Sequence, residues 1–335
     1  MVASPPLAGE TRAAVRFLFA FTFFALGCGS SEDPGASAGA TGGGGSGGEG
    51  GAPPVLDPAT FDCSAAAPER STSVPPACAT DPTCATRLVT GHRGVGGDLG
   101  VIAPENSLAA IRAATVLGVD FVETDPRATA DGVLVNLHDD TVDRTTDGTG
   151  VVAEMTVSQI QALRLDAVEY AGDFSCERVP TIVEVLEAAR GKVHVLLDAN
   201  KTDRVDLLID AVHETDTLEW AIFDTDDVAK IDEALALEPS LFTMIRVAAE
   251  AELDEELAHF EAHPPVVIEL HDGASPTELV PPIHAAGGRA SINGFATDLA
   301  AGLDAEPSHY AELYDTGVDV VQTDRPDLVL RYLGR

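Results

Sequence analysis

Residues 120–144 contain side chains whose types and spacing suit metal binding and proton transfer. An apolar run at 121–122 leads into Glu123 and Asp125, and a second run at 133–137 leads into His138. Side chains alternate along a strand, so Glu123 and Asp125 would point to the same side of an extended chain, as two oxygen ligands of a hard cation would. An isolated Glu-x-Asp is more often the solvated end of a strand. The assignment therefore depends on whether the pattern recurs in the chain.

The pattern does recur from residue 87 onward. Short apolar, β-branched runs alternate with stretches of helical periodicity, and nearly every run ends in a polar residue able to do chemistry. The strand-like runs lie at 88–90, 121–122, 133–137, 193–197, 218–223, 241–245, 266–270, 290–292 and 318–322. We expect helices at 106–118, 156–165, 181–190, 203–213, 227–237, 252–262, 276–286 and 308–316.

This alternation predicts a parallel sheet with helical crossovers. Polar residues at the carboxyl ends of the strands are typical of a (β/α)8 TIM barrel, whose site lies at that end, and we predict this α/β fold for residues 88–335. Nine strand-like runs compete for eight places, so one run must be a hairpin or an edge strand. A doubly wound open sheet is the alternative, but no Gly-rich dinucleotide fingerprint follows any strand.

Four predicted strand ends carry the candidate residues of a site: His92, Glu123 with Asp125, His138, and Asp198. Ligation by carboxylates alone favours one divalent cation, Mg²⁺ or Ca²⁺, over zinc. Imidazole has a pKa that suits acid–base chemistry near neutral pH. Two histidines on opposite sides of a phosphorus suit an in-line displacement, in which one takes a proton and the other gives one.

The composition excludes some classes of partner. The chain has 335 residues, of which 55 are acidic and 20 basic, so its formal charge is −35. Nucleic acids are held by clusters of Lys and Arg, and the sequence has no such cluster, so we expect no nucleic-acid partner. A small anionic substrate would need a local cation, either a metal or a basic side chain.

Residues 1–27 are predicted to be a signal peptide of the lipoprotein type. Arg12 and Arg16 precede an apolar run at 17–26 that is too short to span a bilayer. The run ends in Ala25-Leu26-Gly27-Cys28, which resembles a bacterial lipobox, and residues 28–57 have the Gly- and Ser-rich composition of a flexible linker. We therefore expect an exported protein of the bacterial cell envelope, attached to the membrane only through a lipid at Cys28. Ordinary secretion is the alternative, and no protein partner is inferred.

Residues 58–87 form a cysteine-containing extension before the barrel. Beyond Cys28 the chain has Cys63, Cys78, Cys84 and Cys176, and this even number in an exported protein predicts two disulfides. Their spacing lacks the paired Cys-x-x-Cys ligands of a structural zinc site. Of the three possible connectivities, we choose Cys63 with Cys78 and Cys84 with Cys176.

Taken in order, the motifs of residues 88–332 resemble those of the glycerophosphodiester phosphodiesterase family. The resemblance rests on Gly91-His92-Arg93-Gly94, Pro104-Glu105-Asn106-Ser107, Glu123-Thr124-Asp125, Thr129-Ala130-Asp131-Gly132 running into His138-Asp139, residues 143–150, Val179-Pro180-Thr181 and residues 318–326. It implies a TIM barrel, a divalent cation, and hydrolysis of a small glycerophosphodiester to glycerol 3-phosphate and an alcohol.

The resemblance also implies roles for individual residues. His92 and His138 match the acid–base pair, Glu123 and Asp125 match the first two metal ligands, and Asp198 falls where the third acidic ligand is expected. Arg93 matches the phosphate-contacting arginine. The residues expected to bind the substrate or its phosphate are Arg93, Glu105, Asn106, Lys201 and Asn293. Glu105 and Asn106 could instead cap the helix that follows them.

Three departures from the family's motifs bear on the identity of the substrate. The Glu-x-Lys motif reads Asp198-Ala199-Asn200 here, so Lys201 comes one residue late, and a shift by one residue along a strand turns a side chain to the opposite face. The Trp-Thr-Val-Asn motif reads Ala290-Ser291-Ile292-Asn293, which would remove an aromatic wall of the pocket. Residues 95–103 lengthen the first loop.

Two other functions are compatible with the same sequence. A related phosphodiesterase of the sphingomyelinase D or phospholipase C type could use the same barrel, but the run from Asp131 to Gly150 favours the glycerophosphodiesterase type. A catalytically inactive envelope binding protein is the alternative from another class. Glu269 and His271 end a strand at the same mouth and could line the pocket, but we favour a surface position for both. We expect the loop that begins at Arg144 to shape the mouth of the barrel.

Overall fold

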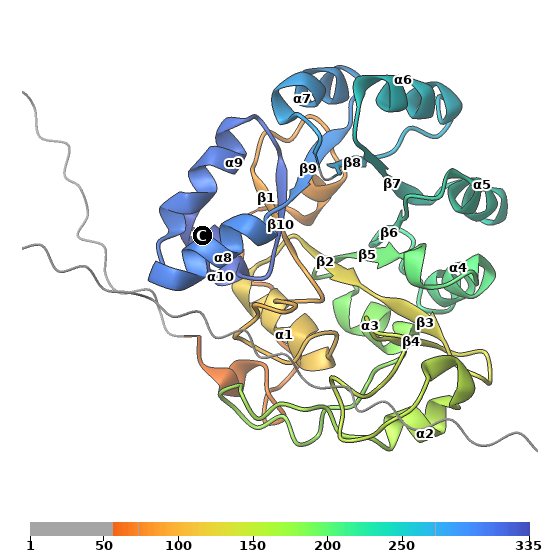
Figure 1. The fold of residues 1–335 in the computed structure, drawn as a ribbon, viewed down its shortest axis with the longest axis vertical. Coiled ribbons are helices and arrows are strands. Elements are labelled where there is room, and N and C mark those ends of the chain that lie inside the picture. Colours follow the sequence, from red (N-terminus) through yellow and green to blue (C-terminus); the bar gives the residue numbers. More distant parts are fainter. Residues whose placement is uncertain (1–55, 73, 272) are drawn as a thin grey trace, which may run out of the picture. The chain divides into compact units, whose positions relative to one another are not determined.

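The computed structural model describes residues 56–72, 74–271 and 273–335. The predicted signal peptide, Cys28 and most of the predicted linker lie outside these residues. Within the described part of the chain, eight parallel strands close into a barrel in the order β1-β10-β9-β8-β7-β6-β5-β2 (Figure 1). They are β1 (Leu88–Gly91), β2 (Phe121–Thr124), β5 (His194–Asp198), β6 (Ala221–Asp224), β7 (Phe242–Val247), β8 (Val267–Leu270), β9 (Arg289–Asn293) and β10 (Val320–Thr323). The predicted TIM barrel is confirmed.

Helices surround the barrel and connect its strands (Figure 1). α1 starts after Ser107, whose side chain accepts a hydrogen bond from the Ala110 amide, and ends at Gly118, where the left-handed φ of 81° favours glycine. α1 spans Leu108–Leu117. The other α-helices are α2 (Val157–Gln161), α3 (Ile182–Ala189), α4 (Val205–Glu214), α5 (Val228–Leu237), α6 (Glu250–His259), α7 (Pro276–Ala285), α8 (Phe295–Asp304), α9 (Ala311–Asp315) and α10 (Pro326–Tyr332). No helix in the described ranges is both long enough and apolar enough to cross a membrane.

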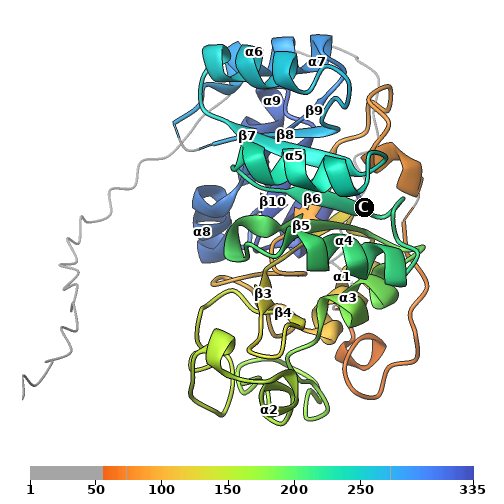
Figure 2. The ribbon, with the colours of Figure 1, turned by 90° about the vertical axis from the view of Figure 1, so that its right-hand side faces the viewer.

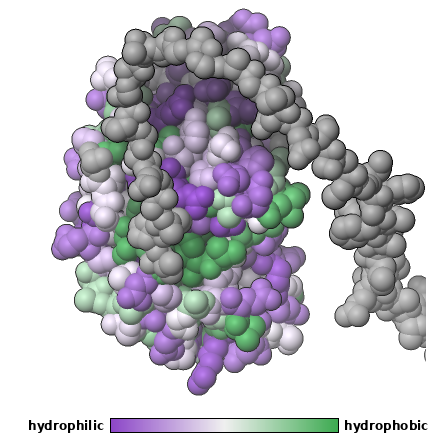
Figure 3. All heavy atoms as spheres, turned by 90° about the vertical axis from the view of Figure 1, so that its left-hand side faces the viewer, coloured by the Kyte–Doolittle hydropathy of each residue, from purple (hydrophilic) through white to green (hydrophobic). Residues whose placement is uncertain are grey.

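The helices α8 and α10 were not predicted from the sequence. Phe295, Leu299 and Leu303 recur every fourth residue along α8, yet they remain 45%, 53% and 85% exposed. A helix is normally recognised by an apolar face that packs on the core, and these residues face away from it. Figure 3 shows the side on which α8, α9 and α10 lie, where apolar areas occur among hydrophilic ones. α10 has only seven residues, too few for a clear period.

The ninth strand-like run, at 133–137, belongs to a hairpin outside the barrel. β3 (Pro126–Ala128) pairs antiparallel with β4 (Leu134–Asn136). Apolar side chains of the hairpin and of the segment that follows it form a small separate core, which includes Val135, Leu137 and Ile160. In both Figure 1 and Figure 2 the hairpin and α2 lie on one side of the barrel. The sequence suggested that His138 follows a barrel strand. In the structure it follows β4 of the hairpin and reaches the mouth of the barrel from there.

The N-terminal extension closes the amino-terminal end of the barrel. Val74, Cys78 and Ala79 pack in one cluster with the inward side chains at the start of the strands, including Leu88 and Phe121. The short 3-10 helix η2 (Pro76–Ala79) carries two of these residues. The extension thus buries apolar surface that the barrel alone would leave open to water.

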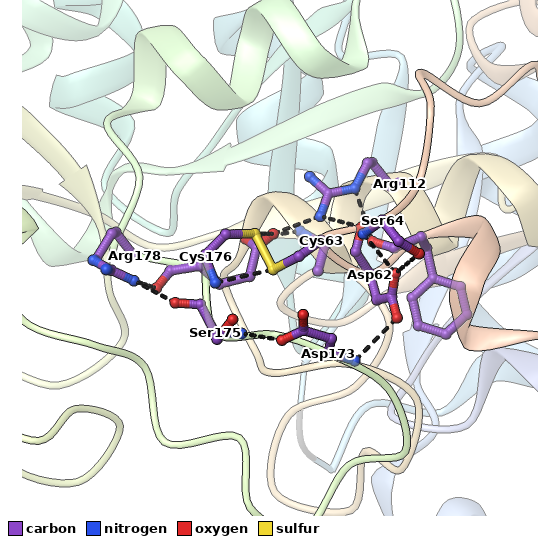
Figure 4. Close-up of a disulfide and its surroundings, with 11 residues drawn as sticks. Asp62, Cys63, Ser64, Arg112, Asp173, Ser175, Cys176 and Arg178 are labelled. Atoms are coloured by element: carbon purple, nitrogen blue, oxygen red, sulfur yellow. Dashed lines mark hydrogen bonds and ion pairs between the residues drawn. A yellow bond between two sulfur atoms is a disulfide. The ribbon is translucent and has the colours of Figure 1, made fainter.

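Two disulfides are present, as predicted, but their pairing differs from the prediction. The bonds join Cys63 with Cys176 and Cys78 with Cys84, so the predicted Cys63–Cys78 and Cys84–Cys176 pairs are wrong. Cys78 and Cys84 both lie in the N-terminal extension, with their Cα atoms 5.4 Å apart. Cys63 lies beside the loop before α3, where its amide donates to the Asp173 carbonyl at 2.8 Å (Figure 4). Spacing along the chain could not reveal this long-range contact.

Asp120 joins three distant parts of the chain at the base of the barrel. Its carboxylate, 3% exposed, accepts hydrogen bonds from Arg70 of the extension at 3.0 Å and from the C-terminal Arg335 at 2.8 and 2.9 Å. The Val89 amide of β1 also donates to it, at 3.0 Å. Two cations and one backbone group therefore depend on a single buried carboxylate.

We expect Asp120→Ala to destabilise the protein by about 3–5 kcal/mol, because the substitution leaves two partly buried guanidinium groups without their anion. The matched control is Asp315→Ala, which removes an exposed pair with Arg87 and should cost about 1 kcal/mol or less. Urea unfolding of the two variants and the wild type measures both values. Equal losses in the two variants would contradict this account of the base.

Candidate active site

A pocket of about 220 Å³ opens at the carboxyl ends of the barrel strands. Parallel strands in a barrel present these ends at one mouth, so residues far apart in the sequence converge there. The lining residues are His92, Glu123, Asp125, His138, Asp198, Lys201, Arg246, Glu269, Leu270, His271, Asn293 and Gln322. Arg93, Glu105 and Asn106, which were expected to bind substrate, are not among them.

Three buried carboxylates form the centre of the pocket. One oxygen each of Glu123, Asp125 and Asp198 lies within 4.8 Å of the others, a spacing at which one cation could be held. Burial, and then the charge of Asp125, raise the pKa of Glu123 to about 8. A bound cation would offset this repulsion, and an all-oxygen donor set suits Mg²⁺ or Ca²⁺. The residues present therefore fit a divalent cation.

Two residues with left-handed backbone orient this triad. Arg93 has a φ of 49° and Asn106 a φ of 55°, conformations that cost a non-glycine residue on the order of 1–3 kcal/mol. The Arg93 amide donates to Glu123 Oε2 at 2.9 Å, and Asn106 Nδ2 donates to Asp125 Oδ2 at 2.8 Å. Ser107 caps α1, which leaves the Asn106 side chain to hold Asp125. The strained backbone thus aims two donors at two of the three carboxylates.

Asp324 holds His92 at the edge of the triad. His92 Nδ1 lies 2.6 Å from Asp324 Oδ1, which also accepts from the Gly97 amide at 2.7 Å. His92 Nε2 lies 3.9 Å from Glu123 Oε2. Burial lowers the pKa of His92, but the hydrogen bond with Asp324 and the charges of Glu123 and Asp324 outweigh it and raise that pKa to about 9. A Cβ on residue 97 would stand 2.8 Å from His92 Nδ1, so the lengthened loop needs glycine there.

A chain of ion pairs holds His138 in the same pocket. His138 Nδ1 lies 2.9 Å from Asp139 Oδ1, and Arg144 donates to Asp139 at 2.8 and 3.1 Å. The Arg144 hydrogen bond holds the pKa of Asp139 well below its usual range. Arg144 also donates to Glu105 at 2.8 and 2.7 Å, and Glu105 accepts from Arg93 at 3.1 Å. Arg144 therefore positions Asp139, and with it His138.

Lys201 reaches the pocket in spite of its shifted position in the sequence. β5 ends at Asp198, and residues 199–201 form a 3-10 turn, η4 (Ala199–Lys201). Such a turn has three residues, so Lys201 returns to the side of Asp198. Its Nζ lies 3.8 Å from Asp198 Oδ2 and 4.0 Å from Asp125 Oδ1. The face reversal expected for a continued strand does not occur.

Arg246 and Glu269 form a wall of the pocket that was not predicted from the sequence. Arg246 donates to Asp224 at 2.8 and 3.2 Å and lies 3.6 Å from Asp198 and 3.5 Å from Glu269. Burial raises the pKa of Asp224 to about 7, although Arg246 opposes the shift. Glu269 is buried, so its predicted surface position is wrong, whereas His271 is exposed at the rim.

The Ala290–Asn293 segment does not lose a pocket wall. Ala290 is fully buried in the main core, among the residues that pack between sheet and helices. Alternation along β9 instead brings Asn293 to the pocket, where its Oδ1 also accepts from the Phe295 amide at 2.9 Å. The same alternation of side chains could have located Arg246, Glu269 and Asp324. These residues lie at or next to the carboxyl ends of β7, β8 and β10, where every second side chain points into the barrel.

The known proteins that this chain resembles are phosphodiesterases. The model of the glycerophosphoryl diester phosphodiesterase family matches residues 92–328. The glycerophosphodiester phosphodiesterase of Caldanaerobacter subterraneus subsp. tengcongensis is 45% identical over 101 residues, which cover 30% of this chain and 39% of that protein. Glycerophosphodiester phosphodiesterase 1 of Homo sapiens is 47% identical over 96 residues, 28% of each chain. The matches thus span less than half the length of these curated relatives.

Solved structures agree over more of the chain. A glycerophosphoryl diester phosphodiesterase from Parabacteroides distasonis superposes with a TM-score of 0.63 at 26% identity, over 74% of this chain and 86% of that one. A phosphodiesterase from Oleispira antarctica, solved with the product sn-glycerol-3-phosphate, has a TM-score of 0.59 at 23% identity, over 75% of this chain and 98% of that one. At this identity the second likeness supports the fold alone.

The triad and the histidines should respond differently to substitution when Mg²⁺ or Ca²⁺ is titrated by calorimetry. We expect Asp125→Ala to weaken binding of the cation by more than about 100-fold, since an outer-shell partner alone is commonly worth about 10–100-fold. Asn106→Ala, which removes such a partner, should fall within that smaller range. His138→Ala should leave the affinity unchanged. Loss of the cation in the histidine variant with retention in Asp125→Ala would reverse these roles.

Proposed function

The chain belongs to the glycerophosphoryl diester phosphodiesterase family, and we propose that it hydrolyses glycerophosphodiesters to glycerol 3-phosphate and an alcohol. One observation carries the proposal. His92 and His138 line a single pocket with a carboxylate triad, and a separate carboxylate holds the Nδ1 atom of each ring. That arrangement suits a reaction in which one group takes a proton and another gives one.

In this proposal Glu123, Asp125 and Asp198 hold a divalent cation. The chemistry that such a cation supplies is stabilisation of the negative charge that develops on the non-bridging phosphate oxygens. Lys201 would add a second positive charge beside the phosphate, because its Nζ lies about as far from Asp125 as from Asp198. Local positive charge is needed in a protein with a formal charge of −35.

The two histidines divide the proton transfers between them. One accepts a proton from the attacking water as its oxygen bonds to phosphorus, and the other donates a proton to the alcohol oxygen as the P–O bond breaks. Asp324 and Asp139 fix the two rings through Nδ1, which leaves each Nε2 for the reaction. A carboxylate that orients an imidazole in this way also stabilises its charged form.

Turnover of glycerophosphocholine should stop when EDTA removes the cation and return with added Mg²⁺ or Ca²⁺. His92→Ala should lower kcat by roughly 10²–10⁴-fold, the usual worth of a general acid or base. His213→Ala is the matched control, because His213 is exposed, pairs with Glu238, and lies outside the pocket, so its kcat should equal that of the wild type. Turnover unaffected by EDTA, or hydrolysis of sphingomyelin in place of glycerophosphocholine, would contradict the proposal.

We also propose that the protein is a lipid-anchored component of the bacterial cell envelope. The support is the lipobox-like sequence that ends at Cys28, followed by the Gly-rich residues up to 57. Cys28→Ala should move the protein from the membrane fraction to the soluble fraction, and Cys84→Ala should not. A wild-type protein that already fractionates as soluble would exclude the anchor.

A further inference from the structure

α8 buries a carboxylate on the side that faces the barrel. Asp298 is 1% exposed, and Ala301 is the other buried residue of this helix, whereas Phe295, Leu299 and Leu303 stay exposed. Burying a carboxylate is costly unless the group is well hydrogen-bonded. Burial raises the pKa of Asp298, although its three hydrogen bonds oppose the shift. The contacts of Asp298 show what this burial achieves.

The three donors to Asp298 come from segments that follow α8 in the chain. Tyr310 Oη donates to Asp298 Oδ1 at 2.6 Å, and Thr323 Oγ1 donates to the same oxygen. The Asp324 amide donates to Asp298 Oδ2 at 2.7 Å. Thr323 Oγ1 also accepts from the Arg325 amide at 2.8 Å, so the turn after β10 is bonded to this one carboxylate directly and through Thr323.

Thr323 and Asp324 are also the two residues that hold His92. The Thr323 carbonyl accepts from the His92 amide at 3.0 Å, and Asp324 Oδ1 lies 2.6 Å from His92 Nδ1. Loop amides orient the carboxylate of Asp324, but the hydrogen bond to Asp298 holds its main chain. Asp298 does not itself line the pocket. It therefore supports both the backbone and the ring of His92 from behind the pocket.

We propose that Asp298 is a positioning residue for the reaction and acts on His92 through Thr323 and Asp324. This inference rests on the proposed function, in which His92 transfers a proton. Removal of the carboxylate would leave three buried donors without an acceptor, and the end of β10 would shift to regain hydrogen bonds. His92 would shift with it, and a displacement of about 1 Å that originates away from the reacting atoms can cost about 10²-fold in rate.

A double-mutant cycle separates this role from a contribution to stability alone. Asp298→Ala should lower kcat for glycerophosphocholine by roughly 10–100-fold with little change in KM, because the group that it displaces takes part in the chemical step. In a His92→Ala background the same substitution should leave kcat unchanged, since the group that Asp298 positions is already absent. Calorimetric titration should give Asp298→Ala the affinity of the wild type for Mg²⁺. Far-UV circular dichroism establishes that each variant is folded.

Two milder variants test the same role if the alanine variant does not fold. Tyr310→Phe removes one donor to Asp298 without opening a cavity, and it should lower kcat by about 3–10-fold, the worth of one hydrogen bond. That loss should also vanish in the His92→Ala background. Asp298→Asn keeps an oxygen that can accept from the Asp324 amide, and the two hydroxyls can accept from its NH₂ group, so its kcat should stay within about 10-fold of the wild type.

Asp304→Asn is the matched control. It removes an exposed carboxylate at the end of the same helix, where Asp304 pairs with His309, and its kcat should equal that of the wild type. An equal loss of kcat in the wild-type and His92→Ala backgrounds, or weaker Mg²⁺ binding by Asp298→Ala, would overturn the inference while leaving phosphodiester hydrolysis intact. Failure of the wild type to hydrolyse glycerophosphocholine would instead overturn the proposed function.

Discussion

The mouth of the barrel is organised by the repulsion among three buried carboxylates. Glu123, Asp125 and Asp198 bring their oxygens within 4.8 Å of one another in a place where water cannot screen them. The surrounding structure responds with positive or hydrogen-donating groups on every side: the Arg93 amide, Asn106, Lys201 and Arg246. Two of these, Arg93 and Asn106, hold left-handed backbone angles to do so. Strain and repulsion of this kind persist only where the rest of the fold over-determines the geometry, and they concentrate at sites of function.

The fold separates the groups that stabilise it from the groups that react. At the base, the carboxylate of Asp120 is fully paired with two arginines and a backbone amide, and the extension fills the barrel end with apolar side chains. At the mouth, Glu269 and Gln322 are buried side chains that line the pocket, and the contact between Glu269 and Arg246 is 3.5 Å long. A complete set of partners gives rigidity, whereas an incomplete set leaves binding capacity for a ligand.

The sequence was most informative where a local rule decides the geometry. Alternation along one strand places Glu123 and Asp125 on the same side, and Ser107 with Gly118 mark the two ends of α1. It was least informative where contacts depend on distant segments. The Cys63–Cys176 bond, the hairpin that carries His138, and the Asp224–Arg246 pair all need the register of the whole barrel. Lys201 lies between these cases, because a single 3-10 turn reverses the face that a continued strand would give.

The cations at the mouth differ in how much of their charge is available to an anionic substrate. Arg144 makes two hydrogen bonds each to Glu105 and Asp139, and Arg93 faces Glu105, so both are engaged in holding the site together. Arg246 is committed to Asp224 along one edge. Lys201 has only longer contacts, 3.8 and 4.0 Å from two carboxylates that a cation would also use. In the proposed function, a metal would neutralise those carboxylates and leave Lys201 as the side chain free to meet the phosphate. The acidic protein would thus hold its substrate's charge with one metal and one lysine, while its arginines shape the pocket around them.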